Sequence, residues 1–296
     1  MDLPDWIAET PHDCPILIAG PTASGKSALA LAIARHSNGL IVNADALQVY
    51  ANWHILTARP SEEDERKNPH RLYGHIAGDQ DYSVGDWLSS VRDLLAQEKR
   101  LIIVGGTGLY FKALTNGLAD IPKTEPELRK STQALYEQDG LRALLEHLDG
   151  ETLAKIDTQN PMRVMRAYEI QMQTGRSIVS WHAQTPPPVL SLKKCLPLVM
   201  ETPKEILNAR INDRFEQMLA HGALDEARAN LATWCSTHPS SKAIGAKELI
   251  AYLKGNMSLS DAQNAATLAT RQYAKRQRTW FRNNMTAWTA LDTRTL

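Results

Sequence analysis

Two adjoining segments decide the fold of this chain: Pro15-Ile-Leu-Ile-Ala19 and Gly20-Pro-Thr-Ala-Ser-Gly-Lys-Ser27. The first is a short apolar run that stops at a glycine, which predicts a buried β-strand. The second matches the pattern G-x-x-x-x-G-K-[ST], and Lys26–Arg35 then has the apolar spacing of a helix. A strand, a glycine-rich loop and a helix in this order predict a phosphate-binding P-loop.

The residues of this loop suit a phosphorylated ligand. Its glycines let the backbone curl so that several N–H groups point at one anion, and the following helix N-terminus adds partial positive charge. Lys26 supplies a full charge for the terminal phosphates, and the Ser27 hydroxyl suits Mg²⁺, the expected cofactor. Phosphate binding is therefore assigned to Gly20, Pro21, Thr22, Ala23, Ser24, Gly25, Lys26 and Ser27.

Further apolar runs extend this unit into a sheet. They are Gly39–Asn43, Arg100–Val104 and Cys195–Met200, although Pro197 in the last run favours an edge strand. A capping box at Thr202-Pro-Lys-Glu205 predicts that a helix begins there. Continuous apolar strands that alternate with helices indicate an α/β fold with a parallel sheet covered on both faces.

The segment 122–189 contains no convincing buried strand. Helical patterns occupy most of it, and it closes with Pro186-Pro-Pro188. We interpret it as a helical insertion domain in a P-loop core made of 1–121 and 190–296, whose C-terminal third is helical throughout. A single undivided domain is the alternative.

The composition excludes several classes of protein. The chain has 296 residues, with 33 basic and 33 acidic side chains, so any nucleic-acid signal must be local. The three cysteines lie far apart and the nine histidines lack zinc spacing, which excludes a disulfide framework and a structural metal. Because the chain has neither a signal peptide nor a ~18-residue apolar run, we expect a cytoplasmic protein that is not in a membrane.

An acidic residue follows the second predicted strand. Asp45 lies where parallel sheets bind ligands, so it could be a general base or reach Mg²⁺ through water; a capping or solvated side chain is the alternative. The next strand runs into Gly105-Gly-Thr-Gly108 with no second acid, which favours a small transferase or kinase over a motor or switch ATPase. This second glycine turn either brings backbone and the Thr107 hydroxyl to a ligand or simply reverses the chain.

A basic stripe, defined as Arg271, Lys275, Arg278 and Arg282, lies near the C-terminus. The spacing of 4, 3 and 4 puts these residues on one helix face, and the segment 270–284 holds no acid. Such a face is typical of polyanion binding, with a solvated surface as the alternative.

Two arginine pairs also share helix faces: Arg163 with Arg166, and Arg210 with Arg214. An arginine that reaches a phosphate site would stabilise charge on a leaving group, whereas surface ion pairs with neighbouring acids are the alternative.

Taken together, these motifs resemble the tRNA dimethylallyltransferase (isopentenyl-tRNA transferase) family over nearly the whole chain. The resemblance is carried by the P-loop with its Pro-Thr-Ala and by further stretches in the family's order. They are Asn43-Ala-Asp-Ala-Leu-Gln-Val-Tyr50, Thr57-Ala-Arg-Pro60, Pro69-His-Arg-Leu72, Tyr82-Ser-Val84, Val104–Phe111, Arg163–Ala167 and Thr270–Phe281.

The resemblance implies a reaction that spacing alone does not. Family members transfer a dimethylallyl group from dimethylallyl diphosphate to N6 of the adenosine 3′ to the anticodon, with Mg²⁺ assisting. The P-loop would then hold a prenyl diphosphate rather than ATP. In this scheme Asp45 accepts the adenine proton, Thr107 lies where the acceptor meets the diphosphate, and Lys26 and Arg214 hold the leaving group.

The same resemblance implies that the insertion and the C-terminal helices grip the anticodon arm of tRNA. Apart from the resemblance, we expect a monomer. Positions that contact tRNA in the family carry over to the following residues of this chain. They are Asp45, Ala46, Leu47, Gln48, Thr107, Arg129, Met162, Arg163, Val164, Met165, Arg166, Lys242 and Lys247, to which the basic stripe adds Arg271, Lys275 and Arg278.

Two positions depart from the family pattern, and two other functions compete with the family's. Ala46 stands where the family usually has serine, and Ala246 where it usually has an aromatic residue. A small-molecule kinase with ATP on the P-loop would leave the basic stripe unused. An RNA-binding protein with a vestigial nucleotide fold would leave Lys26, Ser27 and Asp45 unused. Consumption of ATP, of dimethylallyl diphosphate or of neither distinguishes the three.

Overall fold

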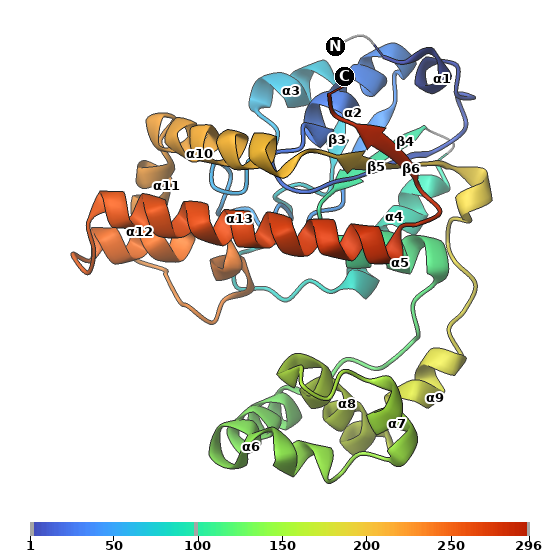
Figure 1. Cartoon of the computed structure of the whole chain (residues 1–296), viewed down its shortest axis with the longest axis vertical. Helices are drawn as coiled ribbons and strands as arrows, with labels where there is room; N and C mark the ends of the chain where they lie inside the picture. The colour runs from blue at the N-terminus through green and yellow to red at the C-terminus, as the bar shows by residue number, and fades with distance from the viewer. Residues whose placement is uncertain (1–2, 98–99, 295–296) are drawn as a thin grey trace. The chain divides into compact units, whose positions relative to one another are not determined.

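The computed structural model describes residues 3–97 and 100–294. It consists of two compact units, one formed by Met1–Thr115 with Leu190–Leu296 and the other by Asn116–Val189 (Figure 1). Within the described residues, no helix has the length and apolar character needed to cross a membrane.

The first unit is built on one six-stranded, all-parallel sheet in the order β3-β2-β4-β1-β5-β6, which confirms the predicted α/β class. The P-loop strand β1 is central, with Ile16 beside Ile102 on one side and Leu196 on the other. The strands are β1 (Ile16–Ala19), β2 (Leu40–Asn43), β3 (His70–Arg71), β4 (Leu101–Gly105), β5 (Leu196–Glu201) and β6 (Thr289–Asp292).

Helices cover both faces of this sheet, as continuous apolar strands require. On one face, Ile16 and Ile18 pack against Leu29 and Ile33 of α2 (Lys26–Ser37). On the other lie α4 (Val84–Leu95) and α5 (Gly108–Asn116), whose Trp87 and Tyr110 rings stack with centroids 4.5 Å apart.

The structure corrects the prediction for β5, which is an interior strand between β1 and β6. The Leu196 N–H donates to the carbonyl oxygen of Pro15, just before β1, so the nitrogen of the next residue, Pro197, faces the other side. Pairing with β6 begins only at Leu198. The proline therefore sits where no ladder hydrogen bond is needed, although the strand is not at the edge.

The predicted capping box after β5 is also wrong. The helix α10 (Lys204–Ala220) begins after Pro203, and no side chain caps it. The Thr202 hydroxyl is instead 3.0 Å from the Thr293 hydroxyl, just past β6. The Thr202 hydroxyl, which the local sequence predicts as the cap of α10, is therefore hydrogen-bonded beside the C-terminal strand β6 instead.

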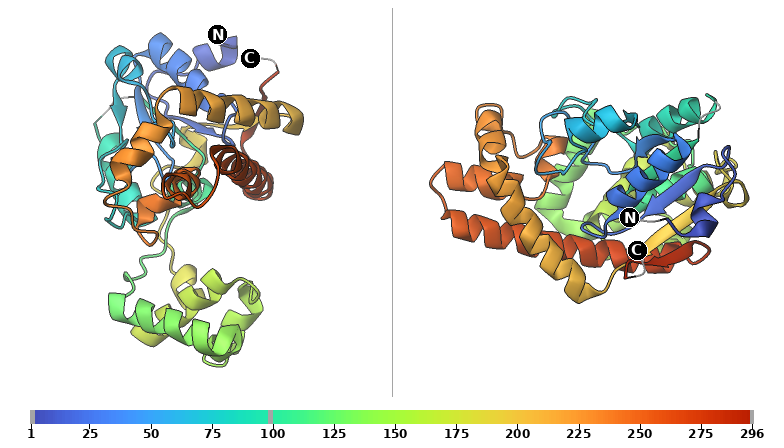
Figure 2. Two further views of the ribbon diagram at one scale, coloured as in Figure 1. Left: turned by 90° about the vertical axis from the view of Figure 1, so that its left-hand side faces the viewer. Right: turned by 90° about the horizontal axis from the view of Figure 1, so that it is seen from above.

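The C-terminal third is helical except for β6, which the sequence analysis missed. A second apolar cluster forms there around Trp53, Phe215 and Leu249. In both views of Figure 2 the long helix α13 belongs to the sheet-bearing unit, and the chain runs from its end into β6. The helices of this third are α10, α11 (Ala223–Asn230), η2 (Pro239–Lys242), α12 (Ala246–Leu253) and α13 (Leu259–Asn284). Shorter ones elsewhere in this unit are α1 (Asp5–Ala8), α3 (Glu62–Lys67) and η1 (Leu192–Lys194).

The second unit is helical in all its regular elements. Its core is formed by Leu144, Leu148, Val164, Met165 and Ala167. Gly140, with a φ of 75°, breaks the first helix of this unit into two parts. The helices are α6 (Pro126–Leu145), α7 (Gly150–Lys155), α8 (Pro161–Thr174) and α9 (Ile178–Ala183).

Candidate active site

The P-loop curls between β1 and α2 as its sequence predicts. Ala23 and Gly25 have φ values of 62° and 89°, a left-handed conformation that non-glycine residues rarely adopt. The Lys26 ammonium donates to Pro21 O at 3.3 Å, inside the turn of the loop. Because strained backbone such as that of Ala23 persists only where surrounding contacts hold it, the protein's own contacts hold the loop in this conformation.

Three charged side chains surround this loop. Burial lowers the pKa of the Lys26 ammonium from 10.5 to about 8; Asp45 opposes this shift, and Arg214 adds to it. Burial also lowers the pKa of Arg214, against the opposing charge of Asp45, but a guanidinium remains protonated. The three predicted catalytic charges therefore act on one another electrostatically, although they come from α2, the loop after β2 and α10.

Asp45 is held by its neighbours rather than left mobile. The Asn43 side-chain oxygen accepts the Asp45 N–H at 2.8 Å, and the Asn43 amide donates to Asp45 O at 2.9 Å. One carboxylate oxygen, Oδ1, accepts the Leu47 N–H at 3.0 Å. The carboxylate thus has a defined direction. Its other oxygen, Oδ2, faces Gly106, because a Cβ placed on that glycine would lie 3.4 Å from Oδ2.

The second glycine turn is packed directly against the Asp45 segment. The Thr107 Oγ1 accepts the Ala46 N–H at 2.9 Å, and the Thr107 N–H donates to Ala44 O at 3.1 Å. A Cβ on Gly105 would lie 2.0 Å from that same Ala44 oxygen, so only glycine permits this approach. The structure therefore brings Thr107 beside Asp45, and the hydrogen bond to Ala46 needs no serine hydroxyl.

Two groups from the C-terminal helices reach into the P-loop. The Gln277 side chain, 5% exposed, accepts the Thr22 N–H at 2.9 Å and donates to Gly106 O at 2.9 Å. Arg214 Nη1 lies 3.4 Å from Thr22 Oγ1. Gln277 is not among the site residues predicted from the sequence, although its spacing from buried Ala274 and Phe281 marks the inward face of α13.

Two phenols near Asp45 were also missed. Burial raises the pKa of Tyr73 and of Tyr273, and the Asp45 charge raises both further. Both phenols therefore stay protonated at neutral pH and remain hydrogen-bond donors. Tyr73 directly follows the stretch Pro69–Leu72, and Tyr273 lies within Thr270–Phe281, but nothing in either stretch indicates that its phenol lies near Asp45.

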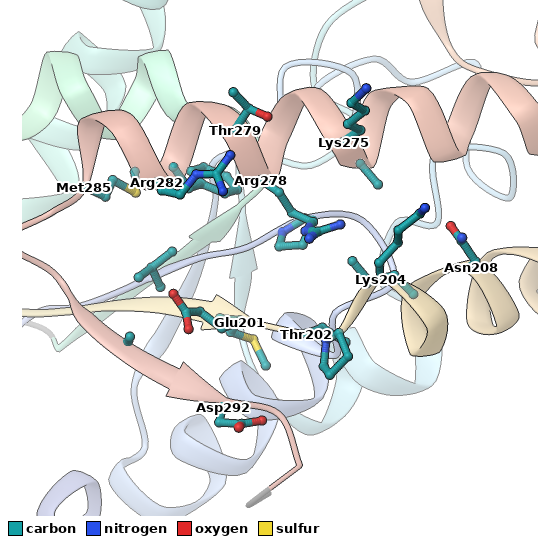
Figure 3. Close-up of a pocket in the computed structure, with 18 of the residues that line it drawn as sticks. Glu201, Thr202, Lys204, Asn208, Lys275, Arg278, Thr279, Arg282, Met285 and Asp292 are labelled. Carbon is teal, nitrogen blue, oxygen red and sulfur yellow. The ribbon is translucent and has the colours of Figure 1, made fainter.

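The basic stripe lies on α13, along a groove of about 860 Å³ that also touches Pro21 of the P-loop. Figure 3 shows Lys275, Arg278 and Arg282 on the α13 side of this groove and Lys204 on the α10 side. Lys275, Arg278 and Arg282 are exposed, whereas Arg271 is half-buried and donates to Asn212 Oδ1 at 2.7 Å. Three of the four cations therefore point to solvent.

Other predicted contact residues of the first unit differ in what their side chains do. Lys242 and Lys247 are exposed, whereas Asp45, Ala46, Leu47 and Gln48 are half-buried. The Gln48 amide donates to Thr57 O at 2.8 Å and to Ala58 O at 3.0 Å, so it shapes its own loop.

In the second unit, the predicted segment Met162–Arg166 has two faces. Met162, 73% exposed, and Arg163 point to solvent, whereas Val164 and Met165 pack inside the helical core. Arg166 donates to Thr124 Oγ1 and pairs with Glu169 at 3.8 Å, the ion pair raised as the alternative. Arg129, on α6, is exposed.

The donor set fits Mg²⁺ only together with a phosphate ligand. Across 3–97 and 100–294, no group of three or more His, Cys, Asp or Glu side chains could hold a metal. The Ser27 hydroxyl is exposed at the first turn of α2. Mg²⁺ commonly keeps several waters and is held by one or two protein oxygens with substrate phosphates, which matches this arrangement.

Known proteins resemble this chain closely. A family model described as IPP transferase matches residues 48–284. The chain is 54% identical to the tRNA dimethylallyltransferase of Cereibacter sphaeroides over 287 residues, covering 97% of this chain and 90% of that protein. It is 56% identical to the tRNA dimethylallyltransferase of Dinoroseobacter shibae over 291 residues, covering 98% of both.

Solved structures agree with these relatives. The full-length tRNA isopentenylpyrophosphate transferase from Bacillus halodurans is 31% identical with a TM-score of 0.67, over 95% of this chain and 90% of that one. A eukaryotic dimethylallyltransferase acting on tRNA is 26% identical with a TM-score of 0.79, over 94% and 73%. With this sheet, this P-loop and these relatives, the chain belongs to the IPP transferase family.

Proposed function

We propose that this chain is a tRNA dimethylallyltransferase that modifies N6 of the adenosine 3′ to the anticodon. The dimethylallyl group moves from its diphosphate to the adenine nitrogen, and diphosphate is released. The observation that carries the proposal is the packing of the P-loop and of the Asp45 segment against one glycine turn. The Gly20 N–H donates to Gly105 O at 3.3 Å and the Ala46 N–H to Thr107 Oγ1 at 2.9 Å, so an anion cradle and a base lie in one site. A kinase would share the cradle but not the RNA-sized basic surface.

The leaving diphosphate is the first charge that the site must stabilise. As the C–O bond of the donor breaks, negative charge grows on the diphosphate, which Lys26, the loop amides and Arg214 surround. Such preorganised donors are worth about 3–4 kcal/mol each in barrier height. Bound Mg²⁺, held by Ser27 and the diphosphate oxygens, would supply further charge neutralisation.

The acceptor nitrogen must lose a proton as its bond to carbon forms. Asp45 accepts this proton through Oδ2, because Oδ1 is already occupied by the Leu47 N–H. The Thr107 oxygen accepts from Ala46, so its hydroxyl is oriented, and it donates to the acceptor adenosine. The adenine must leave its stack to reach these groups, as in other enzymes that act on bases.

We assign binding of the anticodon arm to the insertion 122–189 and to the C-terminal helices. The exposed cations Lys275 and Arg278 of the basic stripe, with Arg271, contact backbone phosphates. Arg129, Met162 and Arg163 offer the exposed side chains of the insertion, while Val164 and Met165 support their helix from inside. The enzyme acts as a monomer in the cytoplasm, where its tRNA substrate is found.

The test is transfer of radiolabelled dimethylallyl to unmodified tRNA with Mg²⁺. Wild type should label the RNA without ATP, Asp45→Asn should not, and Asp79→Asn, at an exposed loop carboxylate, should behave as wild type. ATP consumption without labelled RNA would instead support the kinase, and retention of RNA with neither activity would support the binding protein.

A further inference from the structure

One buried amide joins the two loops of the site. Gln277 accepts the N–H of Thr22 in the P-loop and donates to the carbonyl oxygen of Gly106, both at 2.9 Å. The oxygen and the nitrogen of one side-chain amide thus bind backbone groups that are 84 positions apart in sequence. The Thr22 N–H is thereby directed at a protein group instead of the phosphate cradle.

The two bonded loops carry opposite halves of the reaction. Thr22 belongs to the loop that holds the leaving group, and Arg214 also reaches it. Gly106 precedes Thr107 and adjoins Asp45, the groups assigned to the acceptor. The Gln277 amide is therefore hydrogen-bonded to both halves of the site.

The same residue belongs to the helix that carries the basic stripe. On α13, Ala274, Gln277 and Phe281 are buried, while Lys275 and Arg278 are exposed. Since a helix holds its two faces in a fixed relation, RNA phosphates on the outer face and the reacting loops on the inner face share one rigid support.

We propose that Gln277 is a positioning residue that holds the P-loop and the Gly106–Thr107 turn at reacting distance and ties both to the RNA-binding helix. This inference rests on the proposed function. Gln277 touches no reacting atom, so its effect falls on the transfer step rather than on RNA affinity. A displacement of about 1 Å between reacting groups lowers a rate about 100-fold.

The competing explanation is that Gln277 only fills space. Gln277→Met keeps the length and volume of the side chain but removes both hydrogen bonds. Gln277→Glu keeps the acceptor for Thr22 but sets a carboxylate against Gly106 O until that carboxyl is protonated. The Tyr273 phenol on the same helix is hydrogen-bonded to the Gln277 side chain. The charged groups facing the two loops that Gln277 joins are Asp45 at Gly106, Arg214 at Thr22 and Lys26 at Pro21.

The experiment measures kcat and KM for both substrates, tRNA binding by filter retention, and thermal unfolding. The control is Gln272→Met, at an exposed position of α13. We expect Gln277→Met to lower kcat about 100-fold with unchanged tRNA affinity, and the control to match wild type. For Gln277→Glu, the ratio of its kcat to that of wild type should rise as pH falls from about 8 to about 6, because a buried carboxyl becomes protonated in that range.

Three outcomes would overturn the inference: wild-type kcat in Gln277→Met, a loss of tRNA affinity that accounts for its lost rate, or a Gln277→Glu ratio that does not change with pH. The pH dependence of Gln277→Glu tests the inference even if Gln277→Met fails to fold. Failure of the proposed function would look different, because wild type itself would then transfer no label.

Discussion

Raising the pH above about 8 should weaken binding of the prenyl diphosphate, because the free site then loses a positive charge. Burial has lowered the pKa of Lys26 from 10.5 to about 8, so the ammonium is protonated at pH 7 and mostly neutral at pH 9. The diphosphate binds the protonated form, and its own phosphate ionisations lie near pH 6, below this window. Affinity should therefore be constant near neutral pH and fall above pH 8.

The size of this effect follows from the position of that pKa. Once Lys26 is neutral in the free site, each further pH unit removes about tenfold in affinity, or about 1.4 kcal/mol. Between about pH 7 and pH 9.5 the dissociation constant should rise about 30-fold. The free energy of unfolding of the ligand-free protein should rise between pH 8 and 10.5. Folding lowers the pKa of Lys26, so in this range the unfolded chain binds more protons than the folded one and loses them as the pH rises.

Calorimetric titration of dimethylallyl diphosphate without tRNA measures the affinity directly. The matched control is Lys26→Arg, whose guanidinium stays charged throughout, so that any weaker binding should not vary with pH. A wild-type affinity that is the same at pH 7 and pH 9.5 would contradict this prediction, since Lys26 would then be either fully charged or not in contact with the diphosphate.

Three further results are expected. Arg214→Lys should lower kcat about 100-fold in the label-transfer assay, because a lysine cannot reproduce the guanidinium contact at the P-loop; near-wild-type kcat would contradict its role. Gly105→Ala should lower the unfolding free energy by at least about 2 kcal/mol in urea, since its Cβ would overlap backbone at 2.0 Å, whereas Gly150→Ala meets nothing within 4 Å and should be nearly neutral. Lys275→Ala and Arg278→Ala should each reduce the salt dependence of tRNA binding by about one ion, measured by filter binding from low to high salt; an unchanged slope would exclude phosphate contacts.

The sequence was sufficient to predict secondary structure where the signals for a segment all lie within that segment. The strand, loop and helix of 15–35 form as predicted, because burial, glycine spacing and helix period agree within twenty residues. It was insufficient for β3 and β6, which have two and four residues and lack a buried apolar run. These short strands form because they pair with β2 and β5, which are distant from them in sequence, so the local sequence does not predict them.

The candidate site divides in the same way. Lys26, Asp45 and Thr107 could be selected because each follows a strand that the pattern reveals, and the carboxyl ends of parallel strands share one edge. Gln277 and Tyr273 could not be selected in this way, because the groups that they face are distant in sequence. Thr22 and Gln277, for example, are 255 residues apart. In the insertion, burial of Val164 and Met165 appears only when α8 packs against its neighbours.

The neutral side chain at 277 is what its two contacts require, although it lies among cations. Thr22 offers an N–H and Gly106 offers a carbonyl oxygen, so the side chain between them must accept on one side and donate on the other. Lysine or arginine only donates, and would set a donor against the Thr22 N–H; an ionised carboxylate only accepts, and would repel the Gly106 oxygen. A side-chain amide meets both contacts without adding charge beside Asp45 and the diphosphate. A lysine or arginine at 277 would therefore break the bridge between Thr22 and Gly106, which is a physical reason for the cations of the basic stripe to lie at other positions of α13.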